Sequence, residues 1–119
     1  MPPKKDRTAS SIKSIKSCRI VLVTAPDLKT ARKLAQAALR QRLVACANII
    51  PGVESHYWWD EKVERSREVL ILFKTTRAHL IDLQTLVAKE HPYTTPEFVS
   101  LGADQVSRSY LSWWLQNTL

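Results

Sequence analysis

The sequence predicts an α+β fold in which two helices cover one face of an antiparallel sheet. Three features of the 119-residue chain lead to this prediction. The run Arg19–Thr24 is short, apolar and β-branched, as in a buried strand. Two segments repeat apolar residues at helical spacing. Two long extended segments flank a turn at Asp60–Glu61. The order β-α-β-β-α-β, with right-handed crossovers and a terminal helix, describes a ferredoxin-like sandwich.

The first strand and the first helix are separated by a break at Ala25–Asp27. Asp27 is a favourable residue to cap the helix that follows. In that helix, small and aliphatic residues recur at helical spacing, while most lysines and arginines fall elsewhere. The predicted apolar positions are Ala31, Leu34, Ala35, Ala38 and Leu39. The alanines would let this helix lie close to a sheet.

The longest predicted element is a β-hairpin. Its first arm ends at Trp59 and carries Pro51 and Gly52, which signal a bulge. Its second arm becomes continuously apolar over Val69–Phe73. Each arm would extend roughly 40 Å at about 3.3 Å per residue, whereas a compact domain has a radius of gyration near 13 Å. We therefore expect the outer hairpin to overhang its own core and to be covered by further copies of the chain in a closed assembly.

The second half of the chain predicts a helix over Arg77–Glu90, with Thr76 as a possible cap. A short strand is expected over Phe98–Leu101, and Ser107 is placed to cap a last helix. One face of that helix would carry Tyr110, Leu111, Trp114 and Leu115.

A stiff connector joins the second helix to the last strand. Pro92 and Pro96 each fix φ and remove a backbone donor, so the segment His91–Phe98 can hold polar side chains in a fixed relation. A helix stop with ordinary surface residues is an equally good interpretation of these eight residues alone.

Composition limits the function classes. Residues 1–17 carry five basic groups and one acidic group, which is +4 of the total charge of +7, and predict a disordered basic tail before a single domain at residues 18–119. No apolar run approaches the roughly 18 residues of a membrane span, and no Gly-rich phosphate loop occurs. Cys18 and Cys46 fit two free thiols in a cytoplasmic protein better than a disulfide or a zinc site.

Residues 19–117 resemble the CutA family of divalent-cation tolerance proteins, in motifs that come in the right order and at the right spacing. The matching stretches are Val23–Asp27, Arg42–Gly52, Tyr57–Trp59, Glu68–Thr75, His91–Glu97 and Tyr110–Trp113. The resemblance implies a ferredoxin-like fold and a tight homotrimer with the long hairpins joined between subunits. It also implies tolerance to divalent cations, copper in particular, with a PII-like sensing or signalling role as a further possibility and no catalytic reaction.

His91 and Glu97 are the predicted metal ligands, since imidazole suits copper and a nearby carboxylate completes a weak site for Cu(II) or another divalent cation. Some relatives of the family place a cysteine where this chain has Val23, so a thiolate ligand from the first strand is absent. The alternative for His91 is a structural histidine bonded to backbone or carboxylate.

A ligand pocket is also expected, and the resemblance places it in a cleft between subunits. Its predicted residues are Tyr57, Trp59, Lys74, Tyr93, Tyr110 and Trp113, together with His91 and Glu97. Such a pocket would suit a small ligand with polar groups on an aromatic floor. Interface packing is the alternative, because Trp and Tyr are common interface residues.

Two other functions compete with a metal-response protein. A nucleic-acid-binding module is disfavoured because Glu68–Lys74 is aliphatic and lacks the glycine and stacking aromatics of RNA-recognition strands. An enzyme is disfavoured because no nucleophile and base pair appears in the sequence. No organic cofactor and no membrane partner are expected.

Overall fold

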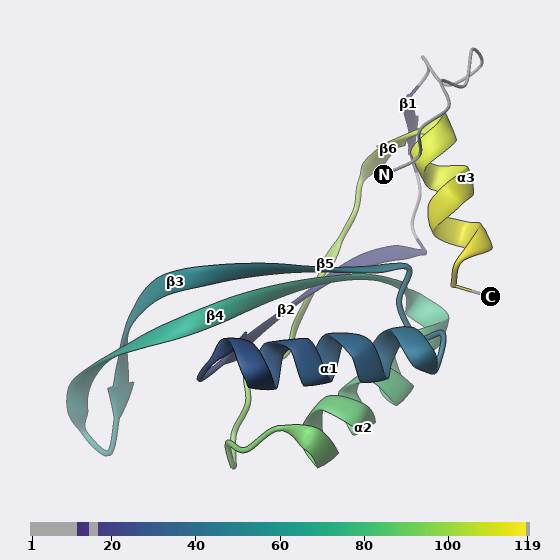
Figure 1. The fold of residues 1–119 in the computed structure, drawn as a ribbon. Coiled ribbons are helices and arrows are strands. Elements are labelled where there is room, and N and C mark those ends of the chain that lie inside the picture. The colour runs from purple at the N-terminus through teal and green to yellow at the C-terminus, as the bar shows by residue number, and fades with distance from the viewer. Residues whose placement is uncertain (1–11, 15–16, 119) are drawn as a thin grey trace.

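The computed structural model describes residues 12–14 and 17–118. Its central sheet is antiparallel, with neighbouring strands in the order β3 (Cys46–Trp59), β4 (Lys62–Thr76), β2 (Cys18–Ala25) and β5 (Val99–Gly102). Helices α1 (Leu28–Arg40) and α2 (Leu80–Glu90) lie side by side under one face of this sheet (Figure 1). The sequence prediction of a ferredoxin-like sandwich is therefore confirmed.

Helix α1 begins as the sequence predicts. The Asp27 carboxylate accepts a hydrogen bond from the Thr30 amide at 2.7 Å, and this bond holds the pKa of Asp27 below its ordinary value. The buried side chains of the helix are Ala31, Leu34, Ala35 and Ala38. Leu39, predicted to share this face, is instead 42% exposed. The chain leaves the helix through Arg42 at φ 59°, the left-handed conformation that commonly ends helices.

The β3–β4 hairpin overhangs the helical layer, as the sequence predicts. Its register shifts between Ile50 and Val53, and Gly52 at φ 77° forms the predicted bulge. Asp60 and Glu61 both have positive φ, as a two-residue type I′ turn requires. The outer half of the ribbon extends past the start of α1 and bends downward in the view of Figure 1, and the molecule measures 52 Å along its longest axis and 25 Å across.

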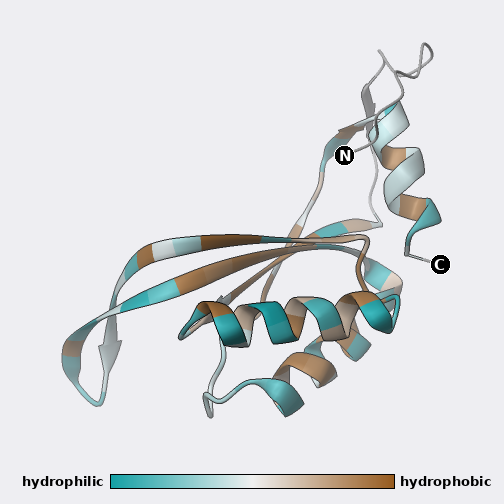
Figure 2. Cartoon of the chain, in the orientation of Figure 1, coloured by the Kyte–Doolittle hydropathy of each residue, from teal (hydrophilic) through white to brown (hydrophobic). Residues whose placement is uncertain are grey.

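Two hydrophobic clusters hold the chain together. The larger one lies between the sheet and helices α1 and α2, with Val21, Ile71 and Phe73 fully buried. The second lies where α3 (Arg108–Gln116) packs on one end of the sheet around Cys18 and Trp114. Hydrophobic positions are concentrated in the inner parts of β3 and β4, while α1 is polar on its outer side (Figure 2).

Three details differ from the sequence analysis. A 3-10 turn, η1 (Arg77–His79), precedes α2, and the Thr76 side chain makes no capping hydrogen bond. Ser107 stands at the start of α3 but also makes no side-chain capping bond. A strand β1 (Ile12–Ser14), inside the segment predicted to be a disordered tail, pairs with β6 (Gln105–Ser107). Residues 1–11 and 15–16 of that predicted tail lie outside the described residues.

On the second face of the main sheet, α3 is the only described helix, and it covers one end. Side chains alternate along a strand, so Leu22, Leu70 and Leu72 point away from the buried Val21, Ile71 and Phe73. They are only partly buried, and Val99 and Leu101 on the neighbouring edge strand are 44% and 48% exposed. We call this side, outside the end that α3 covers, the open face. Among the described residues, no helix is long and apolar enough to cross a membrane.

Candidate functional site

The connector after α2 is fixed to the sheet by His91. This histidine is 7% exposed. Its Nε2 atom lies 2.7 Å from the carbonyl oxygen of Thr24, and its Nδ1 atom accepts a hydrogen bond from the Tyr93 amide at 3.1 Å. These two contacts define a neutral ring that donates from Nε2 and accepts at Nδ1. Both nitrogens are therefore engaged within the chain, which matches the structural alternative stated for this residue.

The connector also reaches a buried carboxylate on β4. The Tyr93 hydroxyl donates to Oε2 of Glu68 at 3.0 Å, and the Tyr93 ring packs on His91 with 4.6 Å between ring centroids. Glu68 is only 8% exposed, and no lysine or arginine of the described chain forms an ion pair with it. Desolvation, the hydrogen bond to Glu68 and the nearby negative charge raise the pKa of Tyr93 to about 12.

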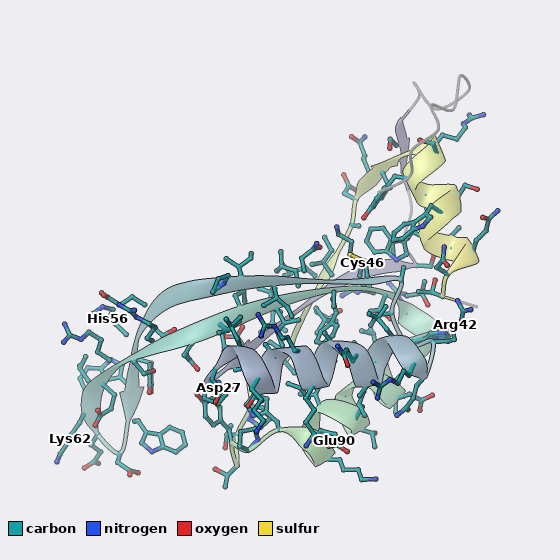
Figure 3. The ribbon with its side chains drawn as sticks, in the orientation of Figure 1. Asp27, Arg42, Cys46, His56, Lys62 and Glu90 are labelled. Carbon is teal, nitrogen blue, oxygen red and sulfur yellow. The ribbon has the colours of Figure 1, made fainter. Side chains whose placement is uncertain are left out.

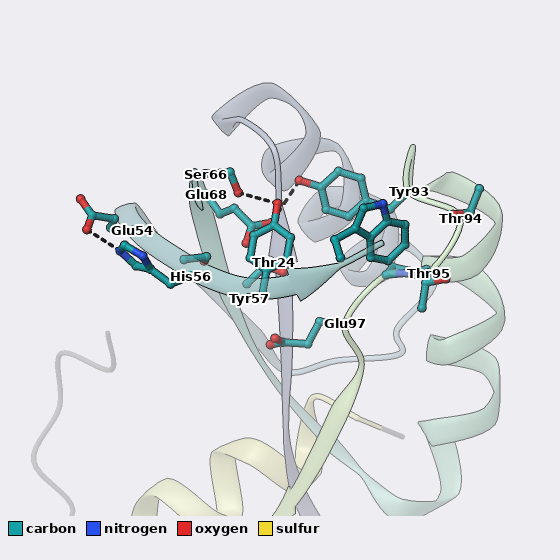
Figure 4. A pocket seen from close by; sticks show the side chains of 13 residues that line it. Thr24, Glu54, His56, Tyr57, Ser66, Glu68, Tyr93, Thr94, Thr95 and Glu97 are labelled. Carbon is teal, nitrogen blue, oxygen red and sulfur yellow. Dashed lines mark hydrogen bonds and ion pairs between the residues drawn. The ribbon is translucent and has the colours of Figure 1, made fainter. Parts of the chain in front are cut away.

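A cleft of about 830 Å³ lies between the connector and the root of the outer hairpin (Figure 4). The connector lines it with Tyr93, Thr94, Thr95, Pro96 and Glu97. The hairpin contributes Glu54, Ser55, His56, Tyr57, Trp59, Ser66 and Glu68, and β2 contributes Thr24. The cleft is therefore built by segments that lie far apart in sequence, and it continues the open face, since Glu68 alternates in step with Leu70 and Leu72.

Negative charge dominates the cleft. No lysine or arginine of the described residues lines it, and three carboxylates do, those of Glu54, Glu68 and Glu97. Glu54 is paired with His56, whose Nε2 lies 2.7 Å from the carboxylate on the outer hairpin. Partial burial, and then the charge of Glu68, raise the pKa of Glu97 above its ordinary value. Glu68 and Glu97 thus form a carboxylate pair that lacks a cationic partner among the described residues.

The aromatic wall of the cleft comes from the hairpin. The hydroxyl of Tyr57 shares a hydrogen bond with Ser66 at 3.1 Å. Tyr57, Tyr93 and Glu97 surround the same space in Figure 4. Trp59 also lines the cleft and is 50% exposed, while its neighbour Trp58 lies outside the lining and is 72% exposed. His56 and Lys62 lie on the same overhanging ribbon, beyond the start of α1 that Asp27 marks (Figure 3).

Within one chain, the predicted pocket divides into two groups. Tyr57, Trp59, Tyr93 and Glu97 line the cleft. His91 does not line the cleft but is bonded to Thr24 and Tyr93 beside it. Lys74, Tyr110 and Trp113 lie at the opposite end of β4. There the Lys74 ammonium donates to the Tyr110 hydroxyl at 3.0 Å, and Tyr110 packs against Trp113 with centroids 5.2 Å apart. Lys74 is six residues beyond Glu68 on the strand, which corresponds to roughly 20 Å. Only an assembly of several chains could bring the two groups into one site.

Coordination of a metal by one chain alone finds little support. No group of three or more His, Cys, Asp or Glu side chains suited to a metal ion occurs in residues 12–14 and 17–118. Cys46 is buried, and its thiol donates to the Asn48 side chain at 3.4 Å, far along the sheet from the cleft. The predicted metal roles of His91 and Glu97 stay predictions.

Glu68 lines the cleft but is not among the site residues predicted from sequence. A signal was present, since a carboxylate directly before the continuous apolar run Val69–Phe73 is an unusual residue to bury. Thr24 and Ser66 carried no comparable signal, because their place in the cleft depends on which strands the fold makes neighbours.

Comparison with known proteins agrees with the resemblance. A profile of the CutA1 divalent ion tolerance protein family matches residues 19–117. The divalent-cation tolerance protein CutA of Thermus thermophilus is 42% identical over 99 residues, covering 83% of this chain and 96% of the relative. The Escherichia coli protein of the same name is 44% identical over 94 residues, covering 79% of this chain and 84% of the relative.

The fold agrees as well. The solved structure of CutA from Synechococcus elongatus superposes with a TM-score of 0.88 at 34% identity, covering 92% of this chain and 97% of that one. The curated relatives are named as tolerance proteins and not as enzymes, in line with the prediction that this chain is not an enzyme. The chain belongs to the CutA1 divalent ion tolerance protein family.

Proposed function

We propose that this chain acts as a homotrimeric divalent-cation tolerance protein and that the cleft between the connector and the outer hairpin binds the cation. The observation that carries the proposal is the pair of carboxylates, Glu68 and Glu97, in a cleft that no lysine or arginine from residues 12–14 and 17–118 lines. Carboxylate oxygens are ligands for divalent cations, and an acidic cleft concentrates them. The relatives are named divalent-cation tolerance proteins, which supports a role in binding such cations.

The shape of one subunit supports an assembly. A compact chain of this length would have a radius of gyration of about 13.5 Å, whereas the Cα atoms give 15.7 Å. The long β3–β4 hairpin contributes to this extended shape, and both β3 and β5 are edge strands of the main sheet. Unpaired edges of this kind are normally covered.

The open face supports the same conclusion. Leu22, Leu70 and Leu72 form an apolar strip along the middle of the sheet, and α3 covers only the end near Cys18. A contiguous apolar strip of this kind marks an interaction site in a soluble protein. A closed ring of three chains would bury the three open faces against one another.

The cation site would be completed by the assembly. Besides Glu54, which is bonded to His56, one chain offers the carboxylates of Glu68 and Glu97 around the cleft. The hydroxyls of Thr24, Ser66 and Tyr57 also line it. Water or a second chain must supply the remaining donors, since the described part of one chain holds no group of three suitable ligands. The cleft continues the open face, so donors from a neighbouring chain would arrive there.

We further propose that copper is one of the cations that the cleft binds. Oxygen ligands alone favour hard cations, whereas copper favours imidazole. His56, which lines the cleft beside Glu54, is an imidazole that a copper ion could reach without breaking the fold. His91 could bind copper only by losing a contact to Thr24 or to the Tyr93 amide.

The assembly is tested with Leu72→Asp on the open face. A charge at that position would be desolvated by the neighbouring chains, at a cost of several kcal/mol. Light scattering on parent protein should give about 41 kDa, three times the chain mass of 13.6 kDa, and the variant should shift toward one chain. Ile81→Asp is the matched control, since Ile81 is 78% exposed on α2 and should leave the trimer intact. A monomeric parent would overturn the proposed assembly.

The cation site is tested by calorimetric titration of Mn²⁺ and Cu²⁺ into metal-free protein. Glu97→Gln should weaken Mn²⁺ binding by about tenfold or more, because it removes one of two charged ligands. Glu61→Gln, at the exposed turn of the same hairpin, should change nothing. The variant His91→Ala tests the predicted role of that histidine. Equal isotherms for parent and Glu97→Gln would remove the cleft from the proposal.

A further inference from the structure

A second groove lies on the helical side of the sheet, along α1 and beside the end of α2. It measures about 540 Å³, which lies in the range of sites for small ligands. Helices α1 and α2 cover the face opposite to the open face (Figure 1). A ring of chains that buries the open faces therefore turns this groove outward. Its space and its charges are those of a single chain and of the proposed trimer alike.

The groove is strongly basic. Four cationic side chains line it, those of Lys29, Arg32, Lys33 and Arg40. All four residues are exposed. Neighbours among them are three, four or seven positions apart or adjacent, so they form one stripe on the outer side of α1. At about 1.5 Å per residue, the stripe is roughly 16 Å long.

This charge is unfavourable for the helix itself. Helix α1 contains no acidic residue. Lys29 and Lys33 are like charges four positions apart, an arrangement that destabilises a helix. Lys29 also lies in the first turn, where the helix dipole disfavours positive charge. An anion in the groove would relieve both effects.

The protein itself compensates only part of the charge. Glu90 is the one carboxylate among the described residues that line the groove, and it forms an ion pair with Lys33 at 3.2 Å. No carboxylate of the described chain is paired with Lys29, Arg32 or Arg40. The Gln36 side chain accepts a hydrogen bond from the Arg40 guanidinium at 3.2 Å, which holds that group along the groove. Three cations are thus available to an anionic ligand.

The chemistry of the lining decides which anion fits. A guanidinium group binds phosphate through two parallel hydrogen bonds, and a lysine ammonium adds a mobile point charge. No described aromatic residue lines the groove, so a nucleic-acid base would find no ring to stack on. Ala37 is the only apolar residue of the described lining, so an acyl chain would gain little there. The ligand would be recognised by its charge alone, and that charge must be dense to meet several cations within one stripe.

From these observations we propose that the groove on α1 binds a linear polyphosphate, either a free phosphate chain or one that carries a nucleoside. Arg32 and Arg40 would each donate to phosphate oxygens, and Lys29 and Lys33 would neutralise the chain between them. The sequence has no Gly-rich phosphate loop, so side chains and not backbone amides would hold the ligand. The site lies on the other side of the sheet from the cation cleft and does not depend on it.

Glu90 provides a prediction of the opposite sign. Its carboxylate competes with a phosphate for Lys33 and repels the ligand. Glu90→Gln should therefore tighten polyphosphate binding, by about threefold or more. A variant that merely loosened the fold would not bind the ligand more tightly.

The test is calorimetric titration of the metal-free full chain with sodium tripolyphosphate, in a phosphate-free buffer. Saturable binding at one site per chain is expected, and it should weaken as NaCl rises from about 0.05 M to about 0.3 M. The double variant Lys29→Gln, Arg32→Gln should bind about tenfold more weakly or worse. Orthophosphate should also bind at least tenfold more weakly, because it reaches fewer cations. The affinity of ATP relative to tripolyphosphate identifies the source of the phosphates, with the tighter ligand being the one the groove fits.

The control must separate the groove from the net charge of +7, which attracts any anion. Lys62→Gln, Arg65→Gln removes the same two charges from exposed positions on the hairpin. It should leave the affinity within about twofold of the parent. Equal weakening by both double variants would overturn the proposal, as would weaker binding by Glu90→Gln or an absence of saturable binding. Tighter binding of a hexaglutamate peptide than of either phosphate compound would also overturn it. None of these results would affect Mn²⁺ binding in the cleft, so the proposed function is tested separately.

Discussion

The hydrogen bond from Tyr93 to Glu68 joins the connector to the hairpin, and Tyr93→Phe removes it without removing the ring. The ring contact with His91 should persist. A hydrogen bond to a charged acceptor contributes about 1.5 to 3 kcal/mol. Because Tyr93 is 36% exposed and water competes for Glu68, we expect a loss near the lower limit, about 1 to 1.5 kcal/mol of unfolding free energy at neutral pH.

The same bond predicts a pH dependence. The pKa of Tyr93 is raised to about 12 in the folded protein, against about 10 for an ordinary tyrosine. A raised folded-state pKa means that the contribution is complete below pH 10 and is lost as the pH rises toward 12. A pKa difference of about 2 between the folded and unfolded protein would correspond to about 2.7 kcal/mol. Solvent screening at this partly exposed site reduces the expected loss of unfolding free energy to about 1 kcal/mol.

Two assays check this prediction. Denaturant unfolding at fixed protein concentration measures the free energy. The chain has three tyrosines, so the phenolate absorbance of the Tyr93→Phe variant is subtracted from that of the parent at each pH. The difference gives the titration midpoint of Tyr93. We expect that midpoint well above 10 in folded protein and near 10 in denaturant. Tyr57→Phe, which loses only a bond to Ser66, is the control and should cost about 0.5 kcal/mol or less. A midpoint near 10 in the folded parent would refute the contact.

Three further changes probe the scaffold. Gly52→Ala should cost about 1 to 2 kcal/mol in denaturant unfolding, because φ is 77° there although nothing crowds the position. Thr75→Val should lower the unfolding free energy by about 1 to 3 kcal/mol, because it removes the hydroxyl that donates to the buried Leu43 carbonyl at 2.6 Å. Thr85→Val, on the exposed side of α2, is the control and should lower it much less. The raised pKa of Glu97 means that its ionised form is disfavoured in the fold, so Glu97→Gln should be more stable than the parent at pH 7. The difference in unfolding free energy between the two should close below about pH 4, where Glu97 is protonated in both the folded and the unfolded chain. Unfolding curves at several pH values check this, and a gap that widens toward acid would contradict it.

Elements with a local cause were predictable from sequence. Pro51 and Gly52 indicate the bulge, and Asp27 before an amphipathic segment indicates the start of α1. The polar turn between two β-rich arms indicates the hairpin and its overhang. In each case, the residues that determine the structure lie within a few positions of one another, so a short window of sequence contains the reason.

The site depended on contacts across the fold, and sequence could predict it only in part. Tyr93 and Glu97 of the connector line one cleft with Tyr57 and Trp59, and their role in binding stays a prediction. His91 donates a hydrogen bond to the carbonyl oxygen of Thr24, 67 residues earlier, and no local pattern reveals this contact. Lys74 and Glu68 both flank one apolar run, yet the length of that strand separates them within a chain.

Anomalous diffraction from crystals of the protein soaked in Mn²⁺ would show whether Glu68 and Glu97 form a cation site. We expect an anomalous peak in the cleft, within coordination distance of both carboxylates and absent in crystals of Glu97→Gln. Peaks confined to other parts of the surface, with the cleft free of manganese at saturating concentration, would contradict it.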